Sequence, residues 1–176
     1  MDRIHEMKTP KDIINLMMSK DAFSNWMNIQ VKSIEKGSCS LSCMIKEDML
    51  NGFSIAHGGI AYSLADSTLA FAANSHGYQS FSIETSISHL VKVKKGDRLT
   101  SASKEIHRGK KTGLYHIEIF NQNNELILVG VEECGYWEGI GKIINSRISG
   151  EGEMTYPDGF KYAGKWVDDK LEGKVI

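Results

Sequence analysis

A run of small and apolar residues at positions 51–77 constrains the fold of this chain more than any other segment. The run reads NGFSIAHGGIAYSLADSTLAFAANSHG, and Asp66 is its single formal charge when histidines are counted as neutral. Its spacing predicts a helix over about residues 58–75, and Gly77 suits the left-handed conformation that commonly closes a helix. Apolar side chains cover nearly the whole circumference, so we expect the rest of the domain to enclose this helix on most sides.

Strand patterns lie on both sides of this helix. The sequence predicts a short amphipathic helix at 11–19 and strands at 26–33, 38–46, 81–91, 98–107, 113–121 and 125–136. Tight-turn sequences between the last four strands predict an antiparallel meander. One sheet curled around one helix is the simplest way to bury that helix, so the predicted fold class is α+β. Cys39 and Cys43 share the inward face of the second strand, and we interpret them as small core residues rather than metal ligands.

Composition and charge narrow the possible functions. The chain has 176 residues, a net charge of −1 and three cysteines with no CxxC motif. A net charge near zero gives no general attraction to nucleic acid or to an anionic membrane. The odd cysteine count favours a reducing compartment, and the charged amino terminus lacks the apolar segment of a secretion signal, so we expect a cytoplasmic protein. Without GxSxG, HExxH or a phosphate-binding glycine loop, serine hydrolase, zinc protease and nucleotidase functions lack support.

Three short motifs in and before the central helix carry a family resemblance. Asn51–Gly52, His57–Gly58–Gly59 and Leu64–Ala65–Asp66, in this order and spacing, resemble the PaaI-type (phenylacetic acid degradation) branch of the hotdog-fold acyl-CoA thioesterases. The likeness extends over about residues 26–136 and implies a hotdog fold, an antiparallel sheet wrapped around one long helix. It also implies hydrolysis of a thioester between an acyl group and coenzyme A. No metal and no cofactor are expected, because coenzyme A is part of the substrate.

The candidate catalytic residues combine chemical reasoning with this resemblance. A glycine N–H at a helix amino terminus can polarise a thioester carbonyl, which makes Gly59 the candidate donor. Asp66 can attack directly as a nucleophile or activate water as a base, and the sequence leaves both mechanisms open. The resemblance implies that Asn51 positions the water or the thioester and that His57 orders the glycine turn. It also suggests Ser82 as a serine near the attacking water.

The spacing of Gly59 and Asp66 implies that the site needs two subunits. Seven residues separate them, so they lie on one face of the helix about 10.5 Å apart along its axis. One carbonyl cannot reach both within a single subunit. We therefore expect a homodimer with two equivalent sites, each formed by the glycine of one chain and the aspartate of the other. A homotetramer of paired dimers is also expected, with its orientation left open.

A basic turn is the candidate binding site for the phosphates of coenzyme A. Arg108, Gly109, Lys110 and Lys111 lie between two predicted strands, where cationic side chains can meet a nucleotide. Charged turn residues are more often merely solvated, so the prediction concerns the cluster and not any single residue.

The carboxy-terminal segment differs in composition from the rest. We predict a thioesterase domain over residues 1–140, then a linker near 142–147 and a small β-hairpin module within 141–176. The module resembles a single MORN repeat through its glycine and aromatic positions, which are Gly150, Gly152, Tyr156, Pro157, Asp158, Gly159, Tyr162, Gly164, Trp166 and Gly173. Its lysines are balanced by acidic residues, so we expect a packing or interaction role and no membrane binding.

One alternative function remains open. A hotdog dimer could bind acyl-CoA without turnover, or act as a scaffold whose carboxy-terminal repeat recruits a partner. The combination of Asn51, His57, Gly59 and Asp66 favours the enzyme, because a protein that only binds does not need these residues together.

Overall fold

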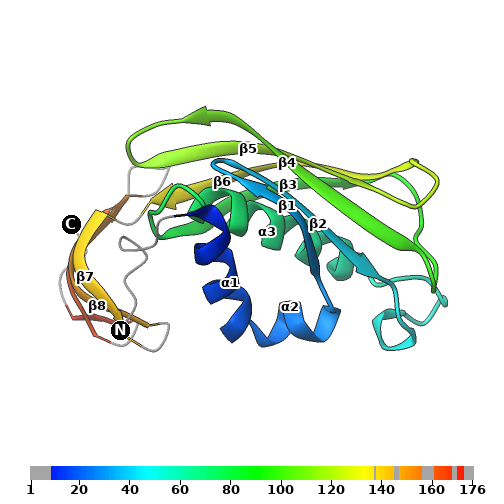
Figure 1. The fold of residues 1–176 in the computed structure, drawn as a ribbon, viewed down its shortest axis with the longest axis horizontal. Coiled ribbons are helices and arrows are strands. Elements are labelled where there is room, and N and C mark those ends of the chain that lie inside the picture. Colours follow the sequence, from blue (N-terminus) through cyan, green and yellow to red (C-terminus); the bar gives the residue numbers. More distant parts are fainter. Residues whose placement is uncertain (1–8, 137, 145–146, 156–160, 168–169, 173–176) are drawn as a thin grey trace.

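The computed structural model describes residues 9–136, 138–144, 147–155, 161–167 and 170–172, with side chains described up to residue 136. The elements of the main domain are α1 (Pro10–Lys20), α2 (Ala22–Met27), β1 (Gln30–Glu35), β2 (Ser38–Met44), the 3-10 helix η2 (Glu47–Met49), α3 (Gly58–Asn74), β3 (Ser80–His89), β4 (Arg98–Arg108), β5 (Thr112–Phe120) and β6 (Leu126–Tyr136). Six strands form one antiparallel sheet in the order β1-β2-β4-β5-β6-β3. Figure 1 shows this sheet curving over α3, as the predicted hotdog fold requires.

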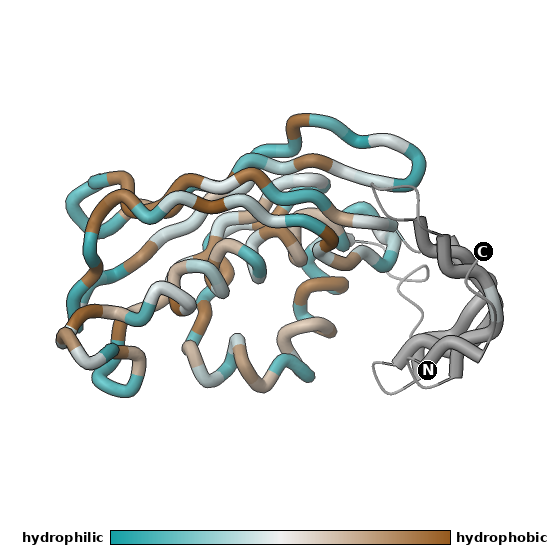
Figure 2. Tube along the Cα trace, turned by 180° about the vertical axis from the view of Figure 1, so that it is seen from behind, coloured by the Kyte–Doolittle hydropathy of each residue, from teal (hydrophilic) through white to brown (hydrophobic). Residues whose placement is uncertain are grey.

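The central helix is enclosed as its sequence predicts. Ten of its residues are buried: Ile60, Ala61, Leu64, Ala65, Thr68, Leu69, Phe71, Ala72, Ala73 and Asn74. The helix contacts β1 to β6, and α1 adds Ile13 and Ile14 to the same core. Figure 2 shows hydrophobic and hydrophilic residues alternating along the strands, the pattern of a sheet with one face on a core.

The buried cysteines match their predicted role. Cys39 and Cys43 share the core face of β2, are 1% and 2% exposed, and are free thiols. Burial raises the pKa of Cys39 to about 12 and that of Cys43 to about 11, so both stay protonated at neutral pH. Two neutral thiols in a hydrophobic core act as small apolar residues.

The predicted meander is wrong in one connection. β3 pairs with β6 and not with β4, which pairs instead with β2 and β5. The predicted order assumed that a short connection joins neighbouring strands. Residues 90–97, however, can reach about 25 Å when extended, against about 14 Å for three steps between strands. The chain therefore crosses from one edge of the sheet to its middle, and β3 becomes an edge strand.

A second difference concerns the first strand. Trp26 and Met27 were predicted as strand but lie in α2. The Asp21 side chain accepts a hydrogen bond from the Ser24 N–H at 2.9 Å and caps this helix, and Asn28 closes it with a φ of 56°. These two caps override the alternating pattern, because they satisfy the backbone groups that a short helix leaves free.

A four-stranded antiparallel sheet follows the main domain. It consists of β7 (Glu138–Ile144), β8 (Arg147–Thr155), β9 (Lys161–Val167) and β10 (Lys170–Glu172), in the order β10-β9-β8-β7. The segment predicted as a linker is therefore largely strand. Several positions of the MORN-like pattern, at 156–159 and 173, lie outside the described residues, and the resemblance and the domain boundary stay predictions. Among the described helices, none is long and apolar enough to cross a membrane.

Candidate active site

The amino terminus of α3 is capped by its own histidine. The Gly59 N–H donates to Nδ1 of His57 at 3.1 Å, and the Ile60 N–H donates to the His57 carbonyl at 2.9 Å. Because Nδ1 accepts, the neutral imidazole carries its proton on Nε2. His57 therefore orders the glycine turn. Its ring nitrogen also accepts the hydrogen bond of the Gly59 N–H, which was predicted to donate to the thioester carbonyl.

Backbone hydrogen bonds hold the loop before α3 in place. The His57 N–H donates to the Met49 carbonyl and the Ala56 N–H to the Val93 carbonyl, both at 2.9 Å. The Asn51 side chain accepts from the Phe53 N–H at 2.8 Å through Oδ1. Its amide nitrogen has no hydrogen bond within the described part of the chain, so it remains available to a ligand.

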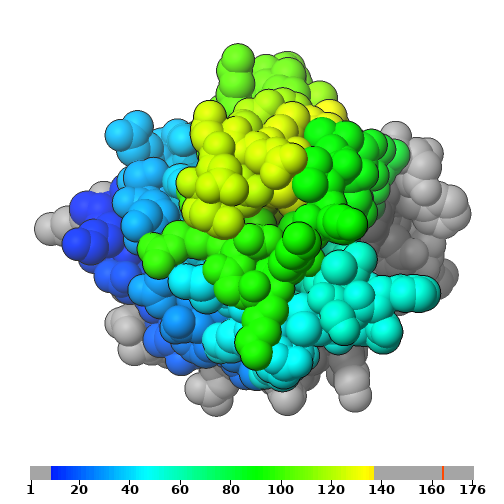
Figure 3. Space-filling model, turned by 90° about the vertical axis from the view of Figure 1, so that its right-hand side faces the viewer, coloured from blue at the N-terminus to red at the C-terminus, as the bar shows by residue number. Residues whose placement is uncertain are grey.

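A pocket of about 250 Å³ lies between this loop and the segment that follows β3. Its lining includes Asn51, His57, Gly58, His89 and Lys92. Figure 3 views this end of the molecule, with the loop in cyan beside the green segment near residue 92. The sequence patterns did not single out His89, whose Nε2 is only 3.5 Å from the position of a Cβ on Gly58. A helix and a strand separate His89 from His57 in the sequence, so only the fold places the two side chains at one pocket.

Asp66 lies in the middle of α3, half-buried, and the described residues offer it no hydrogen bond. It is not among the residues that line the pocket at His57. Gly59 and Asp66 belong to one uninterrupted helix, so the separation of about 10.5 Å along the axis applies to this structure. The structure thus brings together Asn51, His57 and Gly59, and leaves Asp66 two turns away in the same chain.

Glu132 is an acidic residue of this region that the sequence patterns did not identify. It lies on β6 with no exposed surface, on the side of the sheet that faces α3. Burial, with an additional contribution from the negative charge of Asp66, raises its pKa to about 8. A signal was present in the alternation of β6, where a glutamate occupies an inward position between Gly130 and Cys134.

Ser82 lies on β3 opposite Cys134, and its side chain is exposed. The β3 residue opposite Glu132 is Thr85. At about 3.3 Å per residue, Ser82 is about 10 Å further along the strand than Thr85. Thr85 is therefore the hydroxyl residue of β3 that lies level with the pair of Asp66 and Glu132.

The predicted phosphate-binding turn forms a second pocket at the opposite end of α3. This pocket, of about 440 Å³, is lined by Tyr78, Arg108, Gly109, Lys110 and Tyr136. The Arg108 guanidinium lies 5.5 Å from the centre of the Tyr78 ring and 5.3 Å from that of Tyr136, within the range of cation–π interactions. Lys111 adjoins the pocket, because its carbonyl accepts from the Tyr136 N–H at 2.8 Å.

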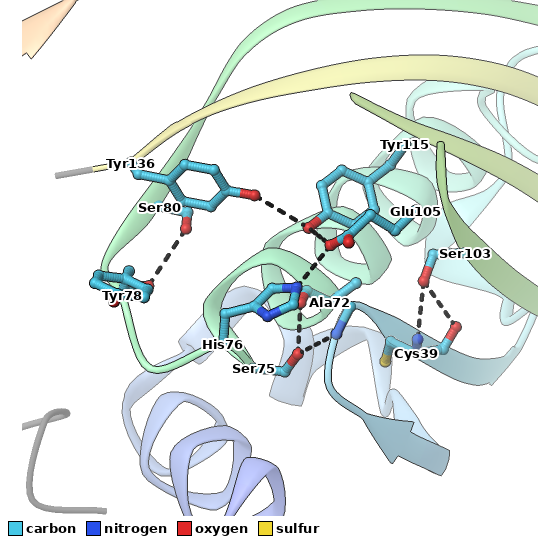
Figure 4. A network of polar contacts seen from close by, with 11 residues as sticks. Cys39, Ala72, Ser75, His76, Tyr78, Ser80, Ser103, Glu105, Tyr115 and Tyr136 are labelled. Carbon is cyan, nitrogen blue, oxygen red and sulfur yellow. Dashed lines mark hydrogen bonds and ion pairs between the residues drawn. The ribbon is translucent and has the colours of Figure 1, made fainter. Parts of the chain in front are cut away.

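A chain of polar contacts supports this pocket from the core side. His76 Nε2 lies 2.6 Å from Glu105 Oε2, and the Tyr115 hydroxyl donates to the same oxygen at 2.7 Å. The Tyr136 hydroxyl lies 3.3 Å from that of Tyr115. Figure 4 shows these four side chains pointing toward one another. Burial raises the pKa of Glu105, but its hydrogen bonds with Tyr115 and His76 outweigh burial and hold the pKa below its usual value. The ionised Glu105 therefore holds Tyr115, whose hydroxyl lies beside that of Tyr136, one of the two tyrosines against which Arg108 packs.

We expect Gly113→Ala to weaken the support of this pocket. A Cβ at Gly113 would overlap the Tyr136 hydroxyl and lie 3.0 Å from the Tyr115 ring, so the tyrosines must shift. Overpacking of this kind costs about 1–3 kcal/mol, measurable as a lower urea midpoint. Gly52→Ala is the matched control, because a Cβ at Gly52 meets no atom within 4 Å. Equal midpoints for the two variants would contradict this prediction.

Known proteins share this fold and are similar in sequence. The family model described as "Thioesterase superfamily" matches residues 53–128. The acyl-coenzyme A thioesterase PaaI of Escherichia coli K12 is 33% identical over 135 residues, which cover 77% of this chain and 91% of that protein. The solved structure of E. coli PaaI aligns with a TM-score of 0.71 and 31% identity, over 72% of this chain and 92% of that one.

A second solved structure is that of smu.793 from Streptococcus mutans UA159, bound to acetyl CoA. It aligns with a TM-score of 0.60 and 25% identity, over 62% of this chain and 88% of that one. The shared fold and the extent of identity with PaaI of E. coli lead to one conclusion. This chain belongs to the PaaI-type family of hotdog-fold acyl-CoA thioesterases.

Proposed function

We propose that this protein hydrolyses acyl-CoA thioesters to a free acid and CoA, with Asp66 as the reacting carboxylate and the Gly59 N–H as the donor to the carbonyl oxygen. The observation that carries the proposal is a half-buried carboxylate in mid-helix, two turns from a glycine N–H at the helix start. Membership of the PaaI-type family supports it. An ionised group among apolar residues is costly, so its presence there favours a function.

The chemistry requires one acid–base group and one electrophilic donor. In the activated-water route, Asp66 accepts a proton from water as the water oxygen bonds to the carbonyl carbon. The Gly59 N–H stabilises the resulting oxyanion, and its collapse breaks the carbon–sulfur bond, with the proton passing to the CoA thiolate. In the direct route an Asp66 oxygen bonds to the carbonyl carbon, the carbon–sulfur bond breaks and CoA leaves as a thiolate. Water then hydrolyses the mixed anhydride, which regenerates Asp66 and releases the acid, and a proton of that water ends on the thiolate.

His57 must give up its hydrogen bond before Gly59 can serve a carbonyl. The bond from the Gly59 N–H to His57 Nδ1, at 3.1 Å, is at the long end of the normal range, and the imidazole is exposed. An incoming thioester oxygen can therefore replace the ring nitrogen as acceptor. In this proposal His57 keeps the donor oriented between turnovers, and Asn51 offers its free amide nitrogen to the thioester or the water.

The edge strand β3 is the proposed dimer contact. It bonds only to β6 within the described sheet, and it exposes apolar side chains such as Phe81. If two copies pair antiparallel along β3, the start of one strand lies beside the end of the other. The end, at His89, borders the His57 pocket, and the start follows Tyr78, which borders the Arg108 pocket. Each CoA phosphate site would then lie near the Gly59 of the other subunit.

Truncating Arg108 should weaken substrate binding more than chemistry. We expect Arg108→Ala to raise KM for acyl-CoA about tenfold with kcat within about twofold, because an interaction with the nucleotide contributes equally to ground state and transition state. Arg108→Lys should restore part of the affinity through its charge. Lys104→Ala, on the exposed face of the same strand, serves as the control. A fall in kcat with unchanged KM would contradict the assigned role.

The deciding experiment is a panel of aryl- and fatty-acyl-CoA esters with detection of released thiol. We expect turnover of at least one ester, and the best substrate would define the acyl group. Saturable CoA binding without hydrolysis of any ester would overturn the proposal in favour of the non-catalytic alternative.

The remaining assignments rest on sequence. We propose that the dimers pair into tetramers, that the protein is cytoplasmic, and that the MORN-like tail is a packing or interaction module. Light scattering of the full chain and of a chain ending at residue 140 would test the assembly and the contribution of the tail.

A further inference from the structure

Glu132 is a buried acid to which the proposed chemistry gives no role. Its side chain has no exposed surface, and neither Oε1 nor Oε2 has a hydrogen-bond partner among the described residues. Buried polar groups in folded proteins almost always have partners, so a carboxyl with both oxygens unpaired calls for a physical reason. No cation of the described chain is among the groups that shift its pKa.

The Glu132 carboxyl lies beside a glycine of its own strand. A Cβ on Gly130 would lie 3.0 Å from Cγ2 of Ile87 and 3.9 Å from Oε1 of Glu132. The carboxyl therefore leans over Gly130 on the helix side of the sheet. The register places Thr85 of β3 on one side of Glu132 and Tyr115 of β5 on the other.

Asp66 is the charge that acts on Glu132. Burial raises the pKa of Glu132 to about 8, and the Asp66 carboxylate contributes in the same direction. Beside Glu132 lie Tyr115, directly opposite it on β5, and Cys134, two residues further along β6, and burial raises the pKa of both, that of Cys134 to about 11. Tyr136 and Glu105 are the next titratable groups on this side of the sheet, and both contact the Tyr115 hydroxyl. On β3 the facing residue is Thr85, which does not titrate. At neutral pH Glu132 is therefore protonated.

We propose that Glu132 is a positioning residue of the active site, whose carboxylic acid O–H hydrogen-bonds toward Asp66 through one water and orients the reacting carboxylate. The bond satisfies the orphaned buried acid. It also restrains one oxygen of Asp66 from the core side, which leaves the other oxygen for water or the thioester. The inference rests on the proposed role of Asp66 and adds Glu132, on the core side of it, to the proposed site.

The test compares Glu132→Gln and Glu132→Leu with the wild type over about pH 6 to pH 9.5. Wild-type kcat should fall as Glu132 ionises near pH 8, because the donor is lost and a second negative charge appears. The Gln variant keeps a donor that cannot ionise, so it should retain kcat within about threefold at pH 7 and lose the alkaline decline. The Leu variant should lose about tenfold in kcat at pH 7 with KM unchanged.

Glu133→Gln is the matched control, since Glu133 points to the opposite side of β6 and should leave the pH profile unchanged. Infrared spectra test the protonation without substrate: a carboxylic acid C=O band at pH 7 should disappear in Glu132→Gln. In Asp66→Asn the same band should titrate at lower pH, because one cause of the shift is removed. If active wild type and Glu132→Gln share one pH profile, or if the band is absent, the positioning role is wrong. Absence of all turnover with the band present would instead reject the proposed function.

Discussion

Asp66→Asn should abolish most of the hydrolysis while leaving the protein folded and able to bind CoA. The substitution keeps the size and hydrogen-bonding capacity of the side chain but removes the charge that attacks or accepts a proton. Loss of a general base or nucleophile lowers kcat by about 10²- to 10⁴-fold. Steady-state kinetics on the best ester of the panel would measure kcat and KM, and calorimetry with CoA would measure binding. Because the proposed role of Asp66 is in the chemical step and not in holding the nucleotide, KM should change little.

Mixing two inactive variants tests whether the site is shared between subunits. Gly59→Pro removes the N–H donor in the first turn of α3, where proline is tolerated, and Asp66→Asn removes the carboxylate. A dimer with one chain of each kind has one site with both groups intact and one site with neither. After subunit exchange of equal amounts, about a quarter of wild-type activity should return, since half of the dimers are mixed. No recovery, despite verified exchange, would show that Gly59 and Asp66 do not act across chains.

The sequence predicted those parts of the site that depend on neighbouring residues. A helix start with His57 as cap and Gly59 in its first turn is a local arrangement, and the structure places the cap hydrogen bond there. The inward face of β2 followed from strict alternation over a few residues. These features need no knowledge of which strands pair.

The features that the sequence missed depend on strand order. His89 joins the pocket, and Thr85 lies opposite Glu132, only because β3 pairs with β6 at the edge of the sheet. A meander would have placed β3 beside β4 instead. Glu132 was overlooked for a related reason, since its partner on α3 lies 66 positions earlier in the chain. A role for this buried acid can be inferred only once α3 is known to pack against β6.

Replacing Glu132 by glutamine should stabilise the protein at alkaline pH and leave it nearly unchanged in acid. The folded-state pKa of about 8 exceeds the ordinary value of 4.5, so the folded state holds a proton that the unfolded state releases between these two values. Stability of the wild type therefore falls as pH rises from about 4.5 to about 8, by up to about 5 kcal/mol at 1.36 kcal/mol per unit. Glutamine does not titrate and avoids this loss, although its buried amide lowers the net gain to about 2–4 kcal/mol.

Urea unfolding at pH 5.5 and pH 8.5 and at fixed protein concentration would measure this difference, with Glu133→Gln as the control. The Glu132→Gln variant should have the higher midpoint at pH 8.5 and a similar one at pH 5.5, whereas parallel pH dependences would refute the prediction. A residue that destabilises the protein as it ionises persists most readily where it contributes to function. If glutamine makes the protein more stable in base, and leucine at the same position makes it slower, the stability cost of Glu132 has an explanation in its bond to Asp66.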